Sequence, residues 1–329
     1  MKTILVSGAG GFIGGHLVSK LLKYNYKVIC VDIKPIHQWF QVFKKTKKHS
    51  LDLNNFNNCL KVTKNVDYVF NLACNMGGMG FIENNKADCM TSVLINTNLL
   101  KASKERKIKK FLFSSSACVY NASKQLNVNN PGLKEEDAYP AEPEDGYGWE
   151  KLFSERMCRH FKEDYGLQVR VIRLHNVYGP NGTYDGGREK APAAICRKVA
   201  KAKLKNKKII EVWGDGKQTR SFMYIDDCIN GMLKIFYSKY SDPINLGSSE
   251  RVSINQMISI IEKIASIKLK KKYLSNKPKG VRGRSSDNKL IKKVIKWEPN
   301  IKLKEGLKKT YIWIHSQISK NNKKRKFEI

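Results

Sequence analysis

The stretch Thr3-Ile-Leu-Val-Ser-Gly-Ala-Gly-Gly-Phe-Ile-Gly14 decides the fold of this 329-residue chain. Its first apolar residues predict a buried parallel strand, and apolar residues at helical spacing over 12–22 predict a helix directly after it. In the turn between them, Gly8 permits a tight bend, Gly11 lets the backbone approach a pyrophosphate, and Gly14 lets helix and strand pack closely. The turn therefore predicts a dinucleotide site at the N-terminus of a helix.

A second strand-like segment, Lys27-Val-Ile-Cys-Val-Asp32, supplies an acidic residue for such a site. The carboxylate of Asp32 can accept hydrogen bonds from adenosine ribose hydroxyls and would repel a 2′-phosphate, so NAD is favoured over NADP. Asp52 can reach the adenine, although an aspartate at this place can also cap a helix. The residues expected to bind NAD are Gly8, Gly11, Phe12, Ile13, Gly14, Asp32, Asp52, Tyr147 and Lys151.

Further strand-like and helical segments alternate through the first half of the chain. The expected strands lie near 67–72, 110–114 and 168–173, and the expected helices near 84–104 and 147–165. Strands that alternate with helices form βαβ units, in which the strands are parallel. The sequence therefore predicts an α/β fold with a doubly wound parallel sheet of the Rossmann type.

The regular alternation of strands and helices ends after Tyr178, where Gly, Pro and Asn cluster at 179–187 and predict a loop. The shorter elements expected beyond it are helices near 192–203 and 226–237 and a strand near 209–212. We therefore expect residues 1–178 to form the NAD-binding Rossmann domain. Residues 179–318 are expected to form a smaller substrate-binding region, with some segments returning to the Rossmann sheet, and the basic residues 319–329 a disordered tail.

The formal net charge of +33 is unusually high. A basic field attracts nucleic acids, anionic membranes and anionic substrates. The basic runs at 44–48, 201–208, 268–272 and 320–326 are dispersed, which is typical of solvated helix faces or a frayed tail, and they lack regular aromatic interleaving. This pattern argues against a nucleic-acid partner, whereas a positive cleft would still concentrate an anionic substrate.

Eight cysteines are scattered singly, without a CxxC pair. This spacing argues against a zinc site or any other metal site of cysteine ligands and against a disulfide framework. No apolar stretch is long enough to span a membrane, and the first residues lack a signal region. We therefore expect a cytoplasmic protein without a membrane partner.

A redox site is indicated by Tyr147 and Lys151, which lie four residues apart and hence on one helix face. A tyrosine with an unperturbed pKa near ~10 is a poor base, so we expect the Lys151 ammonium and a cationic nicotinamide to lower it. Ser116 can hydrogen-bond the same substrate oxygen. Cys118, two residues after Ser116, and Lys190, further along the chain, are not needed for redox chemistry, which indicates that protons are also moved on carbon.

Several longer segments carry a resemblance to a known family. They are 71–80 (NLACNMGGMG), 114–120 (SSSACVY), 140–143 (PAEP), 175–180 (HNVYGP), 186–194 (GGREKAPAA), 213–221 (WGDGKQTRS) and 281–288 (VRGRSSDN). Through them the chain resembles the extended short-chain dehydrogenase/reductase family of nucleotide-sugar enzymes, and within it the branch that epimerises GDP-mannose. Asn75 departs from this pattern, where an aspartate is usual.

The resemblance implies NAD-dependent epimerisation of GDP-mannose at carbons 3 and 5, giving GDP-L-galactose and, as a second product, GDP-L-gulose. Tyr147 would take the proton of the 4-hydroxyl with NAD as the hydride acceptor. The transient 4-ketone would acidify carbons 3 and 5, where Cys118 and Lys190 would exchange protons on opposite faces. Which face the thiol serves stays open.

The resemblance also implies a substrate site and a homodimer packed through the helix that carries Tyr147. The expected catalytic residues are Ser116, Cys118, Tyr147, Lys151 and Lys190. The expected substrate-binding residues are Gly77, Ser116, Ala117, Cys118, Asn176, Glu189, Lys190, Ala191, Lys198, Gln218, Arg220 and Arg284. Arg220 and Arg284 suit a diphosphate because a guanidinium binds phosphate oxygens in pairs.

Two other functions remain as alternatives. One is another GDP- or NDP-sugar epimerase or reductase of the same family, such as an enzyme similar to GDP-L-fucose synthase, which shares the cysteine but usually has histidine in place of Lys190 and prefers NADPH. The other is a non-catalytic dinucleotide sensor or nucleic-acid-binding protein. Such proteins commonly lose the tyrosine or the lysine of the redox motif, and both Tyr147 and Lys151 are present.

Overall fold

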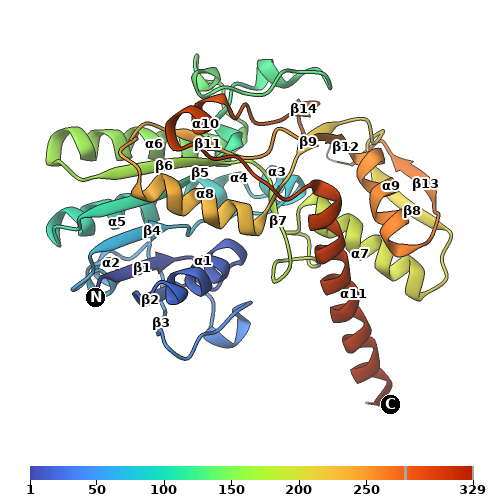
Figure 1. The fold of residues 1–329 in the computed structure, drawn as a ribbon, viewed down its shortest axis with the longest axis horizontal. Helices are drawn as coiled ribbons and strands as arrows, with labels where there is room; N and C mark the ends of the chain where they lie inside the picture. The colour runs from blue at the N-terminus through green and yellow to red at the C-terminus, as the bar shows by residue number, and fades with distance from the viewer. Residues whose placement is uncertain (278–279, 328–329) are drawn as a thin grey trace.

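The central element of the computed structural model, which describes residues 1–277 and 280–327, is a seven-stranded parallel sheet (Figure 1). Its strand order is β11-β6-β5-β4-β1-β2-β3. The strands are β1 (Thr3–Ser7), β2 (Lys27–Asp32), β3 (Lys47–Ser50), β4 (Tyr68–Asn71), β5 (Lys110–Ser116), β6 (Val169–Leu174) and β11 (Ile244–Leu246). The predicted doubly wound Rossmann sheet is confirmed.

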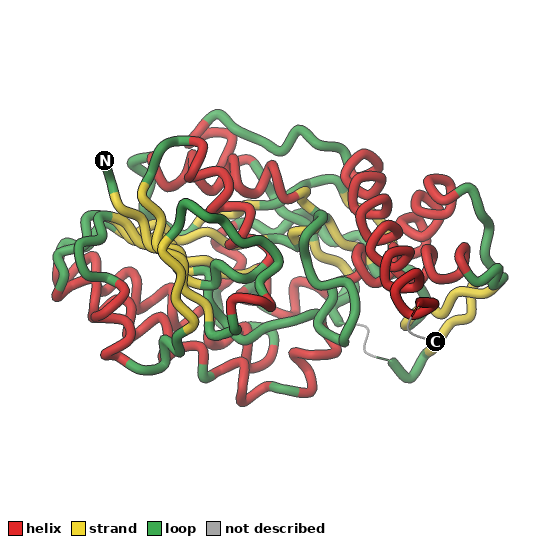
Figure 2. Tube along the Cα trace, turned by 90° about the horizontal axis from the view of Figure 1, so that it is seen from below, coloured by secondary structure: helices red, strands yellow, loops and turns green. Residues whose placement is uncertain are grey.

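Helices cover both faces of this sheet, as the edge-on view in Figure 2 shows. On one face α1 (Phe12–Lys23) packs against α8 (Ile225–Tyr237), and on the other α5 (Ser92–Glu105) packs between α2 (Phe56–Val62) and α6 (Asp145–Tyr165). Residues 4–7 of β1 are buried, as expected for a strand that is covered on both sides. A site can therefore form at the end of the sheet where the carboxyl ends of the strands lie.

The C-terminal region lies beside the carboxyl ends of the sheet strands. Its helices are α7 (Ala191–Leu204), α9 (Ile254–Ala265), α10 (Lys289–Ile295) and α11 (Leu303–Phe327). Its strands are β7 (Val177–Tyr178), β8 (Ile209–Trp213), β9 (Thr219–Ser221), β10 (Met223–Tyr224), β12 (Arg251–Ser253), β13 (Lys270–Leu274) and β14 (Gly283–Arg284). Two segments beyond residue 178, α8 and β11, return to the main sheet.

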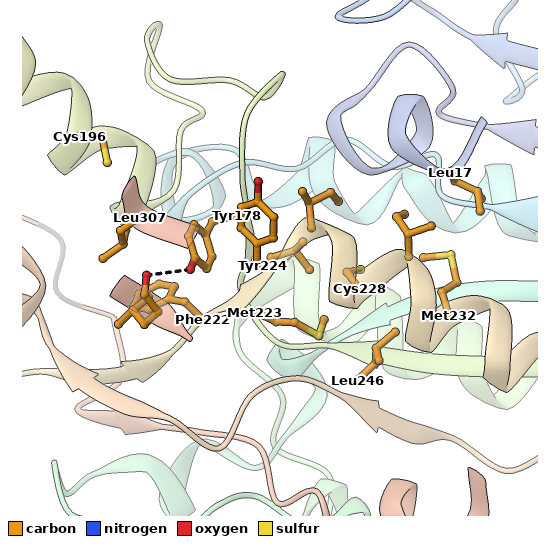
Figure 3. Packing of buried hydrophobic residues seen from close by; sticks show 14 of the residues in the cluster. Leu17, Tyr178, Cys196, Phe222, Met223, Tyr224, Cys228, Met232, Leu246 and Leu307 are labelled. Atoms are coloured by element: carbon orange, nitrogen blue, oxygen red, sulfur yellow. Dashed lines mark hydrogen bonds between the residues drawn. The ribbon is translucent and has the colours of Figure 1, made fainter. Parts of the chain in front are cut away.

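One continuous apolar core joins the sheet to the C-terminal region (Figure 3). Leu17 of α1, Met232 of α8 and Leu246 of β11 belong to the same buried cluster as Cys196 of α7 and Leu307 of α11. Burying apolar surface contributes roughly 25 cal/mol per Å². The two regions are therefore held together by packing rather than by a flexible linker.

The helix expected over 84–104 is wrong in one respect, because the structure has three shorter helices at this place. They are α3 (Met79–Asn84), α4 (Lys86–Met90) and α5. Between α4 and α5, the hydroxyl of Thr91 donates to the carbonyl of Asp88 at 2.8 Å. A side-chain hydroxyl that bonds the preceding turn competes with the backbone ladder, which gives a physical reason for the break.

Two of the basic runs lie on strands instead of on the expected helix faces. The run at 44–48 leads into β3, at the edge of the main sheet, and the run at 268–272 enters β13, which pairs with β8. Lysines on an edge strand keep water at the unpaired backbone groups and hinder pairing with another chain. In this setting the charge protects a sheet edge.

The segment from residue 319, expected to be disordered, continues α11 as far as Phe327, and residues 328–329 lie outside the described part. Extending an existing helix needs no new nucleus, and lysine and arginine have good helix propensity. None of the helices in the described residues is apolar over a length sufficient to cross a bilayer.

Candidate active site

The glycine turn between β1 and α1 opens into a cavity of about 810 Å³. Gly8 adopts a positive φ of 70°, and the amide of Gly11 donates to its carbonyl at 3.0 Å. A Cβ at Gly14 would collide with that same carbonyl oxygen, so helix α1 can approach the strand only with glycine there. Gly8, Gly11, Phe12, Ile13 and Gly14 all line the cavity.

Two carboxylates expected at the cofactor end also line this cavity. Asp32 ends β2, is 8% exposed, and accepts the amide of Lys34 at 3.1 Å. Asp52 accepts the amide of Asn54 at 2.9 Å, so its side chain also closes a turn ahead of α2. The helix-cap alternative for Asp52 is wrong, because Asn55 caps α2, while its place in the cavity lining is compatible with a contact to the adenine.

Lys34 is a cavity residue that the sequence analysis did not single out. Its ammonium donates to the carbonyl of Gly10 at 2.9 Å and lies 5.0 Å from the ring of Phe40, which also lines the cavity. A lysine that ties the glycine turn to the end of β2 places a positive charge next to the helix N-terminus. Both features favour an anionic group in this part of the cavity.

Tyr147 lines the same cavity and is 4% exposed. The ammonium of Lys151 lies 5.6 Å from the tyrosine ring centroid and 3.4 Å from a carboxylate oxygen of Glu150. Burial raises the pKa of Tyr147, whereas its hydrogen bond with Ser116 lowers it. In the protein without its cofactor the pKa of Tyr147 is raised, because the phenol is desolvated and the charge of Glu150 adds to the shift, so the expected lowering by Lys151 together with a cationic nicotinamide stays a prediction.

Cys118 is presented by a short 3₁₀ turn, Ala117–Val119, at the end of β5. The hydroxyl of Ser116 accepts the amide of Cys118 at 3.2 Å, so this serine also caps the turn that carries the thiol. The thiol is 7% exposed. Burial raises the pKa of Cys118, the charge of Glu144 raises it further, and Arg284 opposes both.

Arg284 is directed at this thiol. Its Nη1 lies 3.6 Å from the Cys118 sulfur, its Nη2 donates to Glu144 at 2.6 Å, and its Nε donates to Gln125 at 2.5 Å. All three directions of the guanidinium meet groups of the protein in this structure, and the diphosphate role expected for Arg284 stays a prediction. Arg220 pairs with Arg284 in the β9–β14 ladder, and burial lowers its pKa to about 10.

Lys190 reaches the cavity from the loop before α7 and is half-buried. The loop is attached to the segment after β4, because the amide of Gly78 donates to the carbonyl of Arg188 at 3.0 Å and Arg188 donates to the side chain of Asn75 at 2.8 Å. Burial lowers the pKa of Lys190, and Cys118 lies near enough to influence it. The structure thus brings together Tyr147, Cys118 and Lys190 from three distant segments.

Of the residues expected to bind substrate, Ser116 and Lys190 line the cavity, whereas the others, Cys118, Arg220 and Arg284 among them, do not, and several contact the protein itself. Lys198 donates to the carbonyl of Glu211 at 2.8 Å, Asn176 donates to that of Ser221 at 3.2 Å, and Glu189 accepts Arg197 at 2.5 Å. The others are Gly77, Ala117, Ala191 and Gln218.

Sequence reasoning missed several groups at the reaction centre: Cys74, Gln125, Glu144, Glu150 and Arg188. Cys74 and Arg188 line the cavity. Glu144 and Glu150 flank Tyr147 in the chain, and two carboxylates around a redox tyrosine are a signal that could have found them. Gln125 offers no such signal. Within residues 1–277 and 280–327, no group of three histidine, cysteine or acidic side chains is arranged to hold a metal ion.

Comparison with protein families identifies a match to the NAD dependent epimerase/dehydratase family over residues 4–247. The chain is 46% identical to GDP-mannose 3,5-epimerase of Arabidopsis thaliana over 322 residues, which is 98% of this chain and 84% of that protein. It is 47% identical to GDP-mannose 3,5-epimerase 1 of Oryza sativa subsp. japonica, over 96% of this chain and 82% of that protein.

Solved structures agree on the fold. UDP-glucose 4-epimerase of Thermotoga maritima with UDP-glucose has a TM-score of 0.86 at 25% identity, covering 96% of this chain and 99% of that chain. UDP-glucuronic acid 4-epimerase of Bacillus cereus, in complex with UDP-glucuronic acid and NAD, has a TM-score of 0.82 at 27% identity, with the same coverage.

Proposed function

Because the chain belongs to the NAD-dependent epimerase/dehydratase family, we propose that it epimerises GDP-mannose at carbons 3 and 5 through a transient 4-ketone. The observation that carries the proposal is that the thiol of Cys118 and the buried Tyr147 share one cluster, while the amine of Lys190 lines the same cavity as Tyr147 and lies near enough to Cys118 for the sulfur to influence its pKa. Inversion at carbon requires a proton donor and a proton acceptor on opposite faces. A simple 4-epimerase has no need of this second pair.

NAD is the cofactor of this family, and the residues of the cavity fit it. The glycine turn leaves no room for a Cβ at Gly14, and Asp32 stands at the end of β2, where ribose hydroxyls are bound in such folds. Residues of the turn and the carboxylates of Asp32 and Asp52 would hold the dinucleotide. When bound, NAD supplies a reversible hydride acceptor.

The chain's own groups handle the protons. Tyr147 holds the proton of the 4-hydroxyl, with Ser116 beside it and Lys151 behind its ring. A ketone at carbon 4 acidifies the C–H bonds at carbons 3 and 5, and Cys118 and Lys190 remove and return those protons. The lowered pKa of Lys190 makes its amine a better base near neutral pH.

Incubation with GDP-mannose in deuterated water tests this proposal. We expect deuterium at carbons 3 and 5 by NMR, with the hydrogen at carbon 4 retained. UDP-glucuronate, the substrate named for a relative that is 30% identical, is the comparison sugar. Inversion of UDP-glucuronate at carbon 4 without deuterium, together with unlabelled GDP-mannose, would instead assign a simple 4-epimerase.

Net consumption of NADPH by a GDP-sugar would assign the reductase alternative. Binding of RNA with steep salt dependence, together with no turnover of any sugar nucleotide, would assign the non-catalytic alternative.

We also propose a homodimer packed through α6 and its neighbours. Trp149 and Phe153 lie four residues apart on α6 and are 48% and 57% exposed, and Met90 of α4 and Leu94 of α5 are similarly exposed. A cluster of large exposed apolar side chains commonly marks a protein–protein contact. Sedimentation should show a dimer that Phe153→Arg dissociates, whereas Tyr24→Ser, which alters an exposed aromatic at the end of α1, leaves it intact.

A further inference from the structure

The strongest further feature is a buried carboxylate beside the reactive thiol. The side chains of Glu144 and Arg284 are 10% and 5% exposed, and their ion pair measures 2.6 Å. The same guanidinium lies 3.6 Å from the sulfur of Cys118. One positive group therefore contacts both a permanent anion and a thiol that can become one.

The backbone fixes this arrangement as firmly as the side chains do. The amide of Glu144 donates to the carbonyl of Cys118 at 2.9 Å. A Cβ at Gly148 would collide with that same carbonyl, so the first turn of α6 lies directly against the turn that carries the thiol. Gln125 holds the third direction of the guanidinium at 2.5 Å. Neither Arg284 nor Glu144 can move away without breaking buried hydrogen bonds.

The charges around Cys118 oppose one another. The titratable and charged groups that face it are Glu144 and Tyr147 from α6, Arg284 from β14, Arg220 from β9 and Lys190 from the loop before α7. A guanidinium alone would hold the sulfur as a thiolate, and a carboxylate alone would hold it as a thiol. Burial and Glu144 favour the thiol and Arg284 opposes both, so the carboxylate and the guanidinium act on the sulfur in opposite directions.

We propose that Glu144 is a positioning residue of the reaction centre that, by holding Arg284 and opposing its charge, keeps Cys118 able both to give up a proton and to take one back. The inference rests on the proposed epimerisation, in which an S–H bond forms as a C–H bond breaks, or the reverse. Each turnover must restore the starting state of the sulfur. A thiol trapped in either state would stop after one proton transfer.

The pH profile of alkylation at Cys118 tests this role without requiring turnover. Iodoacetamide is applied to the full-length protein between pH 6 and 10, and the rate at the Cys118 peptide is followed by mass spectrometry. Removing one like charge lowers a pKa by about one unit, and alkylation follows the thiolate fraction, so Glu144→Gln should alkylate about tenfold faster near pH 7. Glu144→Asp, which keeps the charge, should restore most of the wild-type profile.

Glu155→Gln is the matched control, because Glu155 of α6 is also the buried partner of an arginine, Arg173 of β6, but does not contact the thiol. It should lower stability and leave the alkylation profile of Cys118 in place. Superimposed profiles for wild type and Glu144→Gln would overturn the proposal. If Glu144→Gln does not fold, Arg284→Gln tests the same balance in the opposite direction, with slower alkylation expected and an unchanged profile again counting against it.

Deuterium exchange separates this proposal from the proposed function. Wild type that leaves GDP-mannose unlabelled refutes the epimerase assignment, and the alkylation profiles still decide whether Glu144 controls the thiol. With an active enzyme, Glu144→Gln should lower kcat for exchange at carbons 3 and 5 more than it changes KM, since Glu144 acts through the sulfur. A change in KM alone would assign it to substrate binding and contradict the proposal.

Discussion

Two buried arginine–glutamate pairs involve helix α6, and they differ in what the arginine meets next. Arg173 donates to both oxygens of Glu155, at 2.9 and 2.7 Å, and its remaining nitrogen donates to the carbonyl of Glu135 at 2.6 Å. Arg284 also binds a glutamate, Glu144, but it directs its remaining nitrogen at a sulfur. The first pair meets oxygens, including the hydroxyl of Tyr120 at 3.4 Å, whose pKa burial raises, whereas the second meets a thiol that must change its charge in the proposed reaction.

This difference separates a structural pair from a chemical one. A buried ion pair is stable when every donor has a fixed acceptor, as in the Arg173 network. In the Arg284 pair, one donor is matched with a weak acceptor that becomes a strong one as thiolate. The same two residue types therefore hold α6 to the sheet at the middle of the helix and tune a reactive group at its N-terminus.

The largest effect should come from removing the thiol that distinguishes the two pairs. Cys118→Ser should slow deuterium exchange at carbons 3 and 5 by about a thousandfold, since proton transfer loses its group on one face, while NAD binding stays intact. NMR of GDP-mannose in deuterated water measures the exchange. Cys158→Ser is the control, because Cys158 is a buried thiol of α6 that faces Asn96. Near-normal exchange in Cys118→Ser would falsify the distinction.

The Arg173 pair should carry the larger share of stability. Glu155→Gln is expected to lower the free energy of unfolding by about 3 kcal/mol, because it leaves a buried guanidinium without its counter-charge. Urea unfolding measures the change. Glu163→Gln, which breaks an exposed pair with Arg159 on the same helix, should cost less than about 1 kcal/mol. Equal losses of unfolding free energy for both variants would contradict the structural role assigned to the Arg173 pair.

Lys190 tests the chemical role of the site around the Arg284 pair, because it approaches Cys118 from another segment. Lys190→Ala should reduce exchange by about a hundredfold without loss of NAD binding, since the second proton-transfer group is gone. Isothermal titration with NAD and the deuterium experiment together measure both properties. Lys201→Ala, on the exposed side of α7 where Lys201 pairs with Asp185, should behave as wild type. Loss of NAD binding in Lys190→Ala would instead mean that the lysine supports the cofactor.

The smallest effect concerns His175, which is influenced by both arginines. Burial, with smaller contributions from Arg284 and Arg173, lowers the pKa of His175 from 6.5 to about 3, although a hydrogen bond with Asn245 opposes the shift. Between pH 6.5 and 3 the unfolded chain binds a proton that the folded chain does not. Stability should therefore fall as pH decreases, by about 1.4 kcal/mol per pH unit. His175→Gln should flatten this slope in urea unfolding measured between pH 7 and 5, and an unchanged slope would assign it to other groups.

Much of the fold was predictable from local pattern. The run ending at Ser7 and the turn from Gly8 to Gly14 predicted β1, its turn and α1, because burial of a strand and the spacing of a helix face are visible over a few residues. The break at Thr91 and the strand formed by Lys47–Ser50 were not predictable in this way. The helix break depends on one hydrogen bond from the Thr91 hydroxyl to a backbone carbonyl. The strand Lys47–Ser50 forms because the edge of the sheet is available for pairing there.

The residues of the candidate site were likewise predictable only in part from local sequence. The sequence by itself determined the glycine turn, the Tyr147–Lys151 spacing and the presence of Cys118 and Lys190, because each belongs to a short motif with its own chemistry. Only the tertiary structure decided that Arg284 turns toward Cys118, 166 positions away, and binds Glu144 and Gln125, 140 and 159 positions away. Contacts over such separations arise from packing of whole elements, which local spacing does not encode. The groups that surround the thiol are therefore determined by the fold, whereas the presence of Cys118 is visible in the sequence.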